Sequence, residues 1–145
     1  MGQKFAAMVA CVDPRFLHGP NGLTLTHELA IGLGFRCFPV TRAGGVQDLV
    51  RPIREGHRDS IIRDLMVSIG HGAQDVVLVN HEDCKAYPRF SSLDEERRTH
   101  VEDLRNASQF LRSIDDFQEI NIRMFLAELE QRNPDIFIFK EIRPV

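Results

Sequence analysis

A run of four consecutive apolar residues near the middle of the chain, Val76-Val-Leu-Val79, constrains the fold most strongly. A continuous, β-branched run of this length is typical of a strand covered on both faces, as in a parallel sheet. We predict this strand over Asp75 to His81. Further runs with strand character lie at Phe5 to Val12, Phe35 to Val40 and Ile136 to Ile142, and the last alternates as expected for a sheet edge.

Stretches with helical periodicity separate the strands. Thr24 to Leu33 is predicted as a short helix, with Thr24 or Thr26 as its cap and Gly34 as its stop. Arg58 to Ile69 places its apolar residues on one face, which predicts a second helix. Ser92-Leu-Asp-Glu95 is a plausible capping box for a third helix that runs to about Arg105.

The segment from Asn106 to Gln131 also carries apolar residues at helical spacing, and we interpret it as one helix or two that end before Asn133-Pro134. Because strands alternate with helices, the predicted fold class is α/β, with a mostly parallel central sheet of about four to five strands flanked by helices. A length of 145 residues suits one hydrophobic core, so residues 1–145 are predicted to form a single domain.

Charge and hydropathy exclude several classes of partner. The formal net charge is −3, which argues against the basic surface that nucleic-acid binding requires. No apolar run approaches the roughly 20 residues that span a bilayer. The start, Met1-Gly-Gln-Lys-Phe, lacks the charged and apolar segments of a secretory signal, so we expect a cytoplasmic protein that acts on a small molecule.

Three cysteines, an odd number, argue against a disulfide framework and favour metal or catalytic use. Cys37 sits among apolar residues and is predicted to be a core residue. Cys11 and Cys84 belong instead to two polar motifs, Cys11-Val-Asp13-Pro-Arg15 and His81-Glu-Asp-Cys84.

Each of these motifs follows a predicted strand. The sulfurs of Cys11 and Cys84 and the imidazole of His81 form a Cys₂His set, which is a known catalytic zinc set when its fourth position is open. The spacing of His81 and Cys84 lets two ligands turn toward one ion from a single loop. Cys11 comes from a different strand, so the parallel sheet would fix the distance between the ligands.

Asp13 lies two residues after Cys11 and points to the same side if the strand continues. It either orients a zinc-bound hydroxide or replaces water as the fourth zinc ligand. A bidentate pair with Arg15 would hold the carboxylate away from the metal and keep it ionised. The simpler interpretation of the pair, a turn with a surface ion pair, is less favoured beside two cysteines and His81.

Other residues carry weaker sequence signals of a functional role. Gly44-Gly45 would allow a close backbone approach to an anion, but glycine pairs in turns are usually conformational. Glu82 and Asp83 are equally consistent with partners of the zinc ligands and with solvated side chains. The remaining histidines are predicted to be solvated surface residues: His18, His27, His57, His71 and His100.

Together these residues resemble the beta-class carbonic anhydrase family, whose pattern is Cys-x-Asp-x-Arg after a first strand and His-x-x-Cys after a later one. The stretch Ser68-Ile-Gly70 to Cys84 and the turn Thr41-Arg-Ala-Gly-Gly45 are also similar to that family, and the resemblance covers roughly residues 6 to 90. It implies a zinc lyase that hydrates carbon dioxide reversibly to bicarbonate. Its zinc ligands would be Cys11, His81 and Cys84, and its catalytic dyad Asp13 and Arg15.

The resemblance also implies a homodimer or tetramer, with residues 106–131 and the strand Ile136 to Ile142 as suspected interfaces. The sequence departs from the family at Lys85, where glycine usually follows the second cysteine, and a positive φ there would be strained. Thr41-Arg42 replaces the family's Arg-Asn pair. Two alternatives therefore stay open: hydrolysis of carbonyl sulfide or carbon disulfide at the same site, or a non-catalytic zinc-binding relative.

Overall fold

A five-stranded sheet forms the centre of the computed structural model, which describes residues 4–19 and 21–145. The strand order is β2-β1-β3-β4-β5, and the strands β2, β1, β3 and β4 run parallel to one another. β5 is antiparallel to β4 and lies at an edge of the sheet. The predicted α/β class and mostly parallel sheet are confirmed. The strands are β1 (Lys4–Ala10), β2 (Phe35–Thr41), β3 (Ala73–His81), β4 (Asn121–Glu130) and β5 (Asn133–Ile142).

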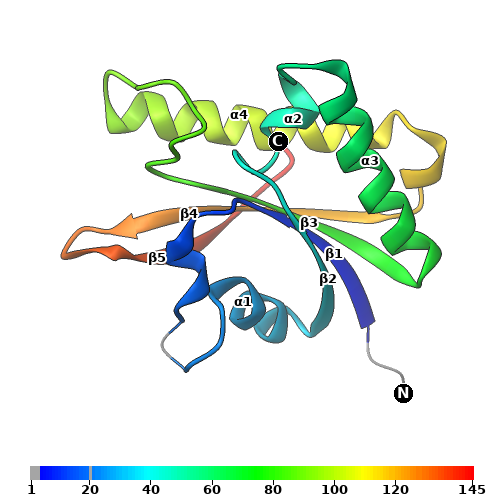
Figure 1. Cartoon of the computed structure of the whole chain (residues 1–145), viewed down its shortest axis with the longest axis horizontal. Helices are drawn as coiled ribbons and strands as arrows, with labels where there is room; N and C mark the ends of the chain where they lie inside the picture. Colours follow the sequence, from blue (N-terminus) through cyan, green and yellow to red (C-terminus); the bar gives the residue numbers. More distant parts are fainter. Residues whose placement is uncertain (1–3, 20) are drawn as a thin grey trace.

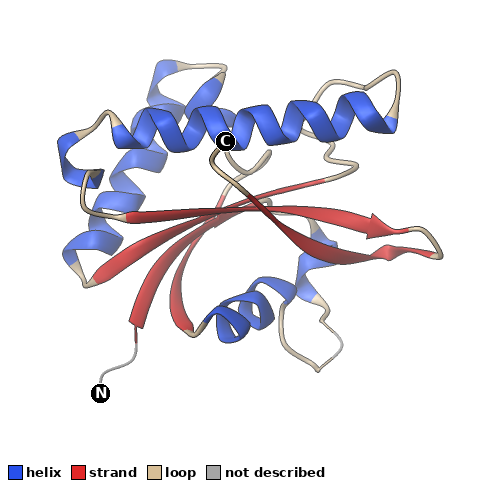
Figure 2. Ribbon diagram, turned by 180° about the vertical axis from the view of Figure 1, so that it is seen from behind, coloured by secondary structure: helices blue, strands red, loops and turns tan. Residues whose placement is uncertain are grey.

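Helices cover both faces of the sheet (Figures 1 and 2). One face carries α2 (Gln47–Val50), α3 (Glu55–Gly70) and α4 (Leu93–Arg112), and the other carries α1 (Leu25–Leu33) and the short 3₁₀ helix η1 (Pro14–Leu17). A second 3₁₀ turn, η2, spans Asp115–Phe117. β3 is buried on both sides, because its alternate residues enter the two separate hydrophobic clusters on either side of the sheet, as predicted.

The ends of α1 lie where the sequence placed them, but α3 begins at Glu55, three residues before the predicted start, and α4 ends at Arg112 instead of about Arg105. Thr24, and not Thr26, caps α1 by accepting a hydrogen bond from the backbone N–H of His27 (3.1 Å). Gly34 ends this helix with a φ of +84°, a conformation that favours glycine. The Ser92 hydroxyl accepts from the N–H of Glu95 (3.1 Å), but the Glu95 carboxylate turns to Ser91 instead of completing the box.

The prediction of helix from Asn106 to Gln131 is wrong over its second half. α4 continues from Leu93 to Arg112, but residues Asn121–Glu130 form β4, which pairs with β3 on one side and β5 on the other. Four consecutive residues of β4, Met124 to Ala127, are buried. Such a run has no period-2 alternation, so pattern alone cannot separate it from a buried helix. Asn133 begins β5 and ends no helix.

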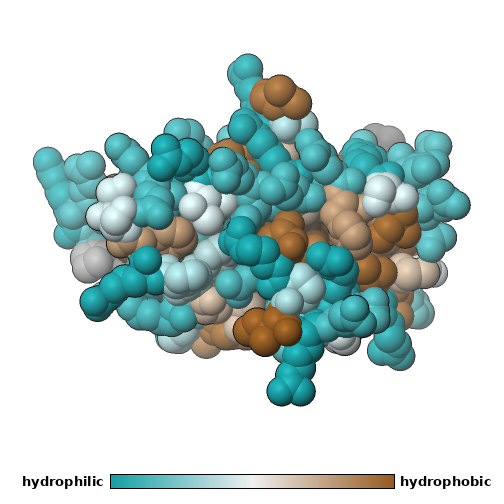
Figure 3. All heavy atoms as spheres, turned by 90° about the horizontal axis from the view of Figure 1, so that it is seen from above, coloured by the Kyte–Doolittle hydropathy of each residue, from teal (hydrophilic) through white to brown (hydrophobic). Residues whose placement is uncertain are grey.

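The surface on the side of α2, α3 and α4 is mainly hydrophilic, with hydrophobic side chains in separate places (Figure 3). Among the described residues, no helix combines the length and the apolar character needed to cross a membrane.

Candidate metal centre

Three potential metal ligands meet where two adjacent parallel strands end. Cys11 directly follows β1, His81 is the last residue of β3, and Cys84 lies in the loop after it. β1 and β3 pair side by side, so their carboxyl ends lie at the same edge of the sheet. The two sulfurs are 3.8 Å apart, and the ligand atoms of all three residues lie within 4.8 Å of one another. All three residues are buried.

The imidazole of His81 is oriented as a ligand would be. Its Nδ1 lies 2.7 Å from the carbonyl oxygen of Glu82, and because a carbonyl only accepts, Nδ1 carries the hydrogen. Nε2 then presents a lone pair, and it is a buried atom with no hydrogen-bond partner among the described residues. A buried nitrogen without a partner is costly and needs a physical reason. A cation shared with two sulfurs supplies one, so this donor set fits a zinc ion.

The two thiols influence each other strongly. The hydrogen bond with Cys84 lowers the pKa of Cys11, and the N–H of Gly44, which donates to the Cys11 sulfur (3.4 Å), acts in the same direction. The pKa of Cys84 is raised, first by its contact with Cys11 and then by burial. One thiolate therefore forms readily and the second is disfavoured. A divalent cation would relieve the repulsion between two thiolates and favour both.

Asp13 and Arg15 form a bidentate ion pair beside this cluster. Arg15 donates from Nε to Oδ1 of Asp13 (3.0 Å) and from Nη2 to Oδ2 (2.8 Å), and its backbone N–H also donates to Oδ1 (2.8 Å). These bonds lower the pKa of Asp13. Both side chains are mostly buried, with exposures of 12% and 18%, so this is not a surface ion pair. Oδ2 of Asp13 lies 3.8 Å from Nε2 of His81, which places the carboxylate next to the donor set.

The guanidinium of Arg15 also contacts the loop between His81 and Cys84. Its Nη1 donates to Oδ2 of Asp83 (3.2 Å), and its Nη2 donates to the carbonyl oxygen of the same residue (3.1 Å). Asp83 has a φ of +57°, the only positive φ of a non-glycine residue in the described chain. The strained conformation in this loop therefore falls on Asp83 and not on Lys85. Aspartate tolerates it better than most residues.

Glu82 and Asp83 differ in a way the sequence left open. Glu82 is 2% exposed, and its carboxylate accepts hydrogen bonds from Nε of Arg97 (2.9 Å) and from the backbone N–H of Leu129 (2.7 Å). It thus fastens the ligand loop to α4 and β4. The side chain of Asp83 is 49% exposed and pairs with Arg15.

The Gly44-Gly45 turn packs directly against the site. Both residues have positive φ, +81° and +59°. A Cβ atom on Gly45 would lie 2.4 Å from Oδ1 of Asn80 and 2.6 Å from the carbonyl oxygen of Val79, which leaves no space for a side chain. Glycine at these positions therefore lets the turn approach β3 closely enough for the Gly44 N–H to reach the sulfur of Cys11.

His100 and Cys37 lie differently from what the sequence predicted. His100 was expected on the surface, and this is wrong: it is 0% exposed, because α4 turns it toward Asn80 and Tyr87. His18, His27 and His71 are exposed as expected, and His57 is half-buried. Cys37 is half-buried, not fully in the core, and burial raises its pKa to about 11.

Aromatic side chains that the sequence did not connect with the motifs form one wall of the site. The rings of Phe16 and Phe137 lie 5.4 Å and 5.2 Å from the His81 ring, and the Arg15 guanidinium lies 4.8 Å from the centre of the Phe137 ring. Phe137 belongs to β5, so only the strand pairing brings it to the site. The alternation of Phe137 and Phe139 was the available signal that the two share a face.

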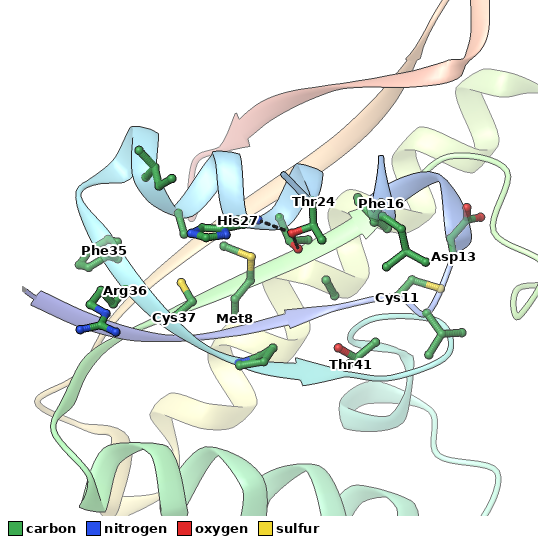
Figure 4. Close-up of a pocket in the computed structure, with 17 residues that line it drawn as sticks. Met8, Cys11, Asp13, Phe16, Thr24, His27, Phe35, Arg36, Cys37 and Thr41 are labelled. Carbon is green, nitrogen blue, oxygen red and sulfur yellow. Dashed lines mark hydrogen bonds between the residues drawn. The ribbon is translucent and has the colours of Figure 1, made fainter. Parts of the chain in front are cut away.

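A cavity of about 690 Å³ opens beside Cys11 and Asp13, between α1 and the strands β1 and β2 (Figure 4). Figure 4 shows Cys11 and Asp13 at one end of it and Phe35 at the other, with Met8 and Cys37 between them. Further apolar residues line it, including Phe16, Leu17, Ala30, Ile31 and Pro39. A largely apolar cavity with a few polar groups in its lining is a common form of small-molecule site.

No family model matches this chain, and no curated protein matches its sequence significantly. Among solved structures, a carbonic anhydrase from Glaciozyma antarctica is similar, with a TM-score of 0.56 and 18% identical residues. The match covers 92% of this chain and 80% of the other one. At this identity the similarity shows a carbonic-anhydrase-like fold and nothing finer. The chemistry of the site therefore depends on the chain's own residues.

Proposed function

We propose that the protein is a zinc enzyme that hydrates carbon dioxide reversibly to bicarbonate. Cys11, His81 and Cys84 would hold the ion. The proposal rests mainly on Nε2 of His81, a buried atom that lacks a hydrogen-bond partner in the described chain. The ligand atoms of His81, Cys11 and Cys84 lie within 4.8 Å of one another. The carboxylate of Asp13 is next to them, with its Oδ2 3.8 Å from Nε2 of His81.

When bound, zinc supplies a Lewis acid that lets water ionise near neutral pH. Asp13 is the residue that can orient a hydroxyl group there. As a carboxylate it only accepts hydrogen bonds, and because its pKa is lowered it does not take up a proton near neutrality. A hydroxyl group held there could donate its hydrogen to Asp13, which lines the cavity together with Cys11.

Arg15 determines which of two roles Asp13 takes. Its side chain occupies both carboxylate oxygens through fixed, bidentate hydrogen bonds. A carboxylate held in this way cannot readily move to become the fourth ligand of the metal. The geometry therefore favours the role in which Asp13 orients a hydroxyl group over the role in which it replaces water on the metal.

The cavity suits a neutral substrate better than a charged product. Its walls are built mainly from apolar side chains such as Met8, Phe16 and Ile31, which do not hydrate an anion. Carbon dioxide is neutral and apolar and would enter without desolvation cost, whereas bicarbonate would tend to leave. The volume exceeds what a triatomic molecule needs, which keeps carbonyl sulfide and carbon disulfide as candidate substrates of the same site.

We further propose that the protein is a homodimer. Most apolar residues of the segment from 106 to 131 pack in the chain's own core and offer little interface. On β5, however, Ile136 and Ile138 are 43% and 56% exposed on an edge strand. A second copy of this chain placed there would cover them.

The test combines metal analysis with rapid-mixing assays of carbon dioxide hydration, between about pH 7 and 9, where zinc-bound water ionises. The native chain should carry one zinc and be active, Cys84→Ser should lose both, and Asp13→Asn should keep the zinc and lose activity. Native protein without zinc, or Cys84→Ser with full activity, contradicts the proposal. Zinc with turnover of carbon disulfide alone selects the other substrate, and zinc with no turnover at all selects a non-catalytic protein.

A further inference from the structure

Asn80, the residue directly before His81 on β3, is the centre of a buried polar network. It is 1% exposed. Its Oδ1 accepts a hydrogen bond from the backbone N–H of Val46 (3.0 Å), and its Nδ2 donates to the hydroxyl of Tyr87 (2.9 Å) and to Nδ1 of His100 (3.0 Å). Both amide hydrogens and the amide oxygen of this side chain therefore have partners.

Each of these bonds leads to a different part of the donor set. Val46 follows the Gly44-Gly45 turn, whose Gly44 N–H donates to the sulfur of Cys11. Tyr87 ends the turn that begins at the second cysteine, since its N–H donates to the carbonyl oxygen of Cys84 (3.2 Å). The backbone of Asn80 continues directly into His81. One side chain thus connects the supports of all three ligands.

The direction of every hydrogen bond in this network can be assigned. The Tyr87 hydroxyl donates to the carboxylate of Asp103 (2.7 Å), which also accepts from Arg51. The hydroxyl oxygen must then accept from Asn80. Nδ1 of His100 likewise accepts from Asn80, so Nε2 of His100 carries the hydrogen; Oε2 of Glu96 lies 3.6 Å from it, beyond hydrogen-bond distance. In this arrangement both partners accept from position 80, and the amide of Asn80 supplies the two donors that they need.

We propose that Asn80 is a positioning residue that pre-organises Cys11, His81 and Cys84 for a divalent cation. This rests on the proposed metal site. The side chain does not reach the ion itself. It fixes the turn beside Cys11 and the loop of Cys84 relative to His81, so that the three donor atoms converge before the ion arrives. Residues that orient ligands from behind typically change metal affinity 10- to 100-fold when replaced.

The informative variant is Asn80→Asp, which keeps the size and the acceptor for Val46 but removes both donors. Tyr87 and His100 would then face a carboxylate oxygen where each now receives a hydrogen bond. We expect Co²⁺ to bind roughly 10- to 100-fold more weakly, with altered thiolate-to-cobalt absorption bands. The matched control is Asn106→Asp, which makes the same chemical change on the exposed surface of α4 and should leave affinity and spectrum unchanged. Tyr87→Phe removes a single hydroxyl and should weaken Co²⁺ binding less, which provides a test if Asn80→Asp does not fold.

Two measurements separate positioning from stabilisation of the fold: titration of the full chain with Co²⁺, and urea unfolding of the metal-free chain. The inference predicts weaker Co²⁺ binding by chains that remain folded. If Asn80→Asp or Tyr87→Phe unfolds more easily but binds Co²⁺ with native affinity and spectrum, the role is purely structural and the inference is overturned. If the native chain binds no Co²⁺, the metal site itself is wrong, and the inference falls with it.

Discussion

The substitution Arg15→Lys tests the proposed dyad most sharply, because it keeps the positive charge and removes the planar fork. Arg15 makes two side-chain hydrogen bonds to Asp13 and two to Asp83. A lysine ammonium acts as a point charge and cannot reproduce the bidentate contact. At least one charge-assisted hydrogen bond to Asp13 is then lost, about 1.5–3 kcal/mol for a mostly buried pair.

Converted at about 1.4 kcal/mol per factor of ten, this loss predicts a fall in the carbon dioxide hydration rate of roughly 10- to 100-fold. Zinc content should stay at one per chain, because the three ligands are untouched. The pH dependence should stay that of the native chain over the assay range, because the lowered pKa of Asp13 and its ordinary value of about 3.9 both lie well below the pH at which zinc-bound water ionises.

The assay is rapid-mixing hydration at several pH values, with metal analysis of the same samples. Arg123→Lys is a suitable control, because Arg123 makes a comparable bidentate pair with Glu141 (2.8 and 2.7 Å) away from the ligands. It should remain fully active. Native rates in Arg15→Lys would refute the claim that Arg15 holds Asp13 for catalysis.

Three further predictions follow from the same geometry. Gly45→Ala should lower the free energy of unfolding in urea by about 1–3 kcal/mol, because its Cβ would lie 2.4 Å from Oδ1 of Asn80 at a positive φ. Gly56→Ala, whose Cβ would meet no atom within 4 Å, should not lower it. Equal stability of the two variants would contradict the close packing of the turn. Removal of metal by a chelator should lower the thermal unfolding midpoint of the native chain and leave that of Cys84→Ser unchanged, by calorimetry. Light scattering should give the mass of a dimer, and Ile138→Lys should shift it to a monomer; a native monomer would contradict the proposed interface.

The parts of the fold that the sequence predicted are those encoded by local patterns. The β-branched run of β3, the Thr24 cap and the stop at Gly34 each depend on residues that are neighbours in the chain. β4 was missed because its identity depends on pairing with β3 and β5, and its buried run satisfies a helical pattern equally well. Tertiary context decided what local periodicity left undetermined.

The candidate site was likewise predictable where it depends on contiguous motifs and not where it depends on packing. The ligand types and their placement after strands were visible in the sequence, because each motif is contiguous and parallel strands end at one edge. The supporting residues were not visible: Asn80 and His100 come from β3 and α4, and Phe137 comes from the last strand. His100 was predicted to be a solvated surface residue like the other histidines outside the motifs, and only the packing of α4 against Asn80 and Tyr87 shows otherwise.

The central claim is that Cys11, His81 and Cys84 converge on one ion. X-ray absorption at the zinc edge of the native protein tests it directly. The account predicts one zinc per chain with two sulfur ligands at about 2.3 Å and a nitrogen at about 2.0–2.1 Å, and loss of one sulfur or of the whole ion in Cys84→Ser. Zinc surrounded only by nitrogen and oxygen, or a spectrum that Cys84→Ser leaves unchanged, would contradict it.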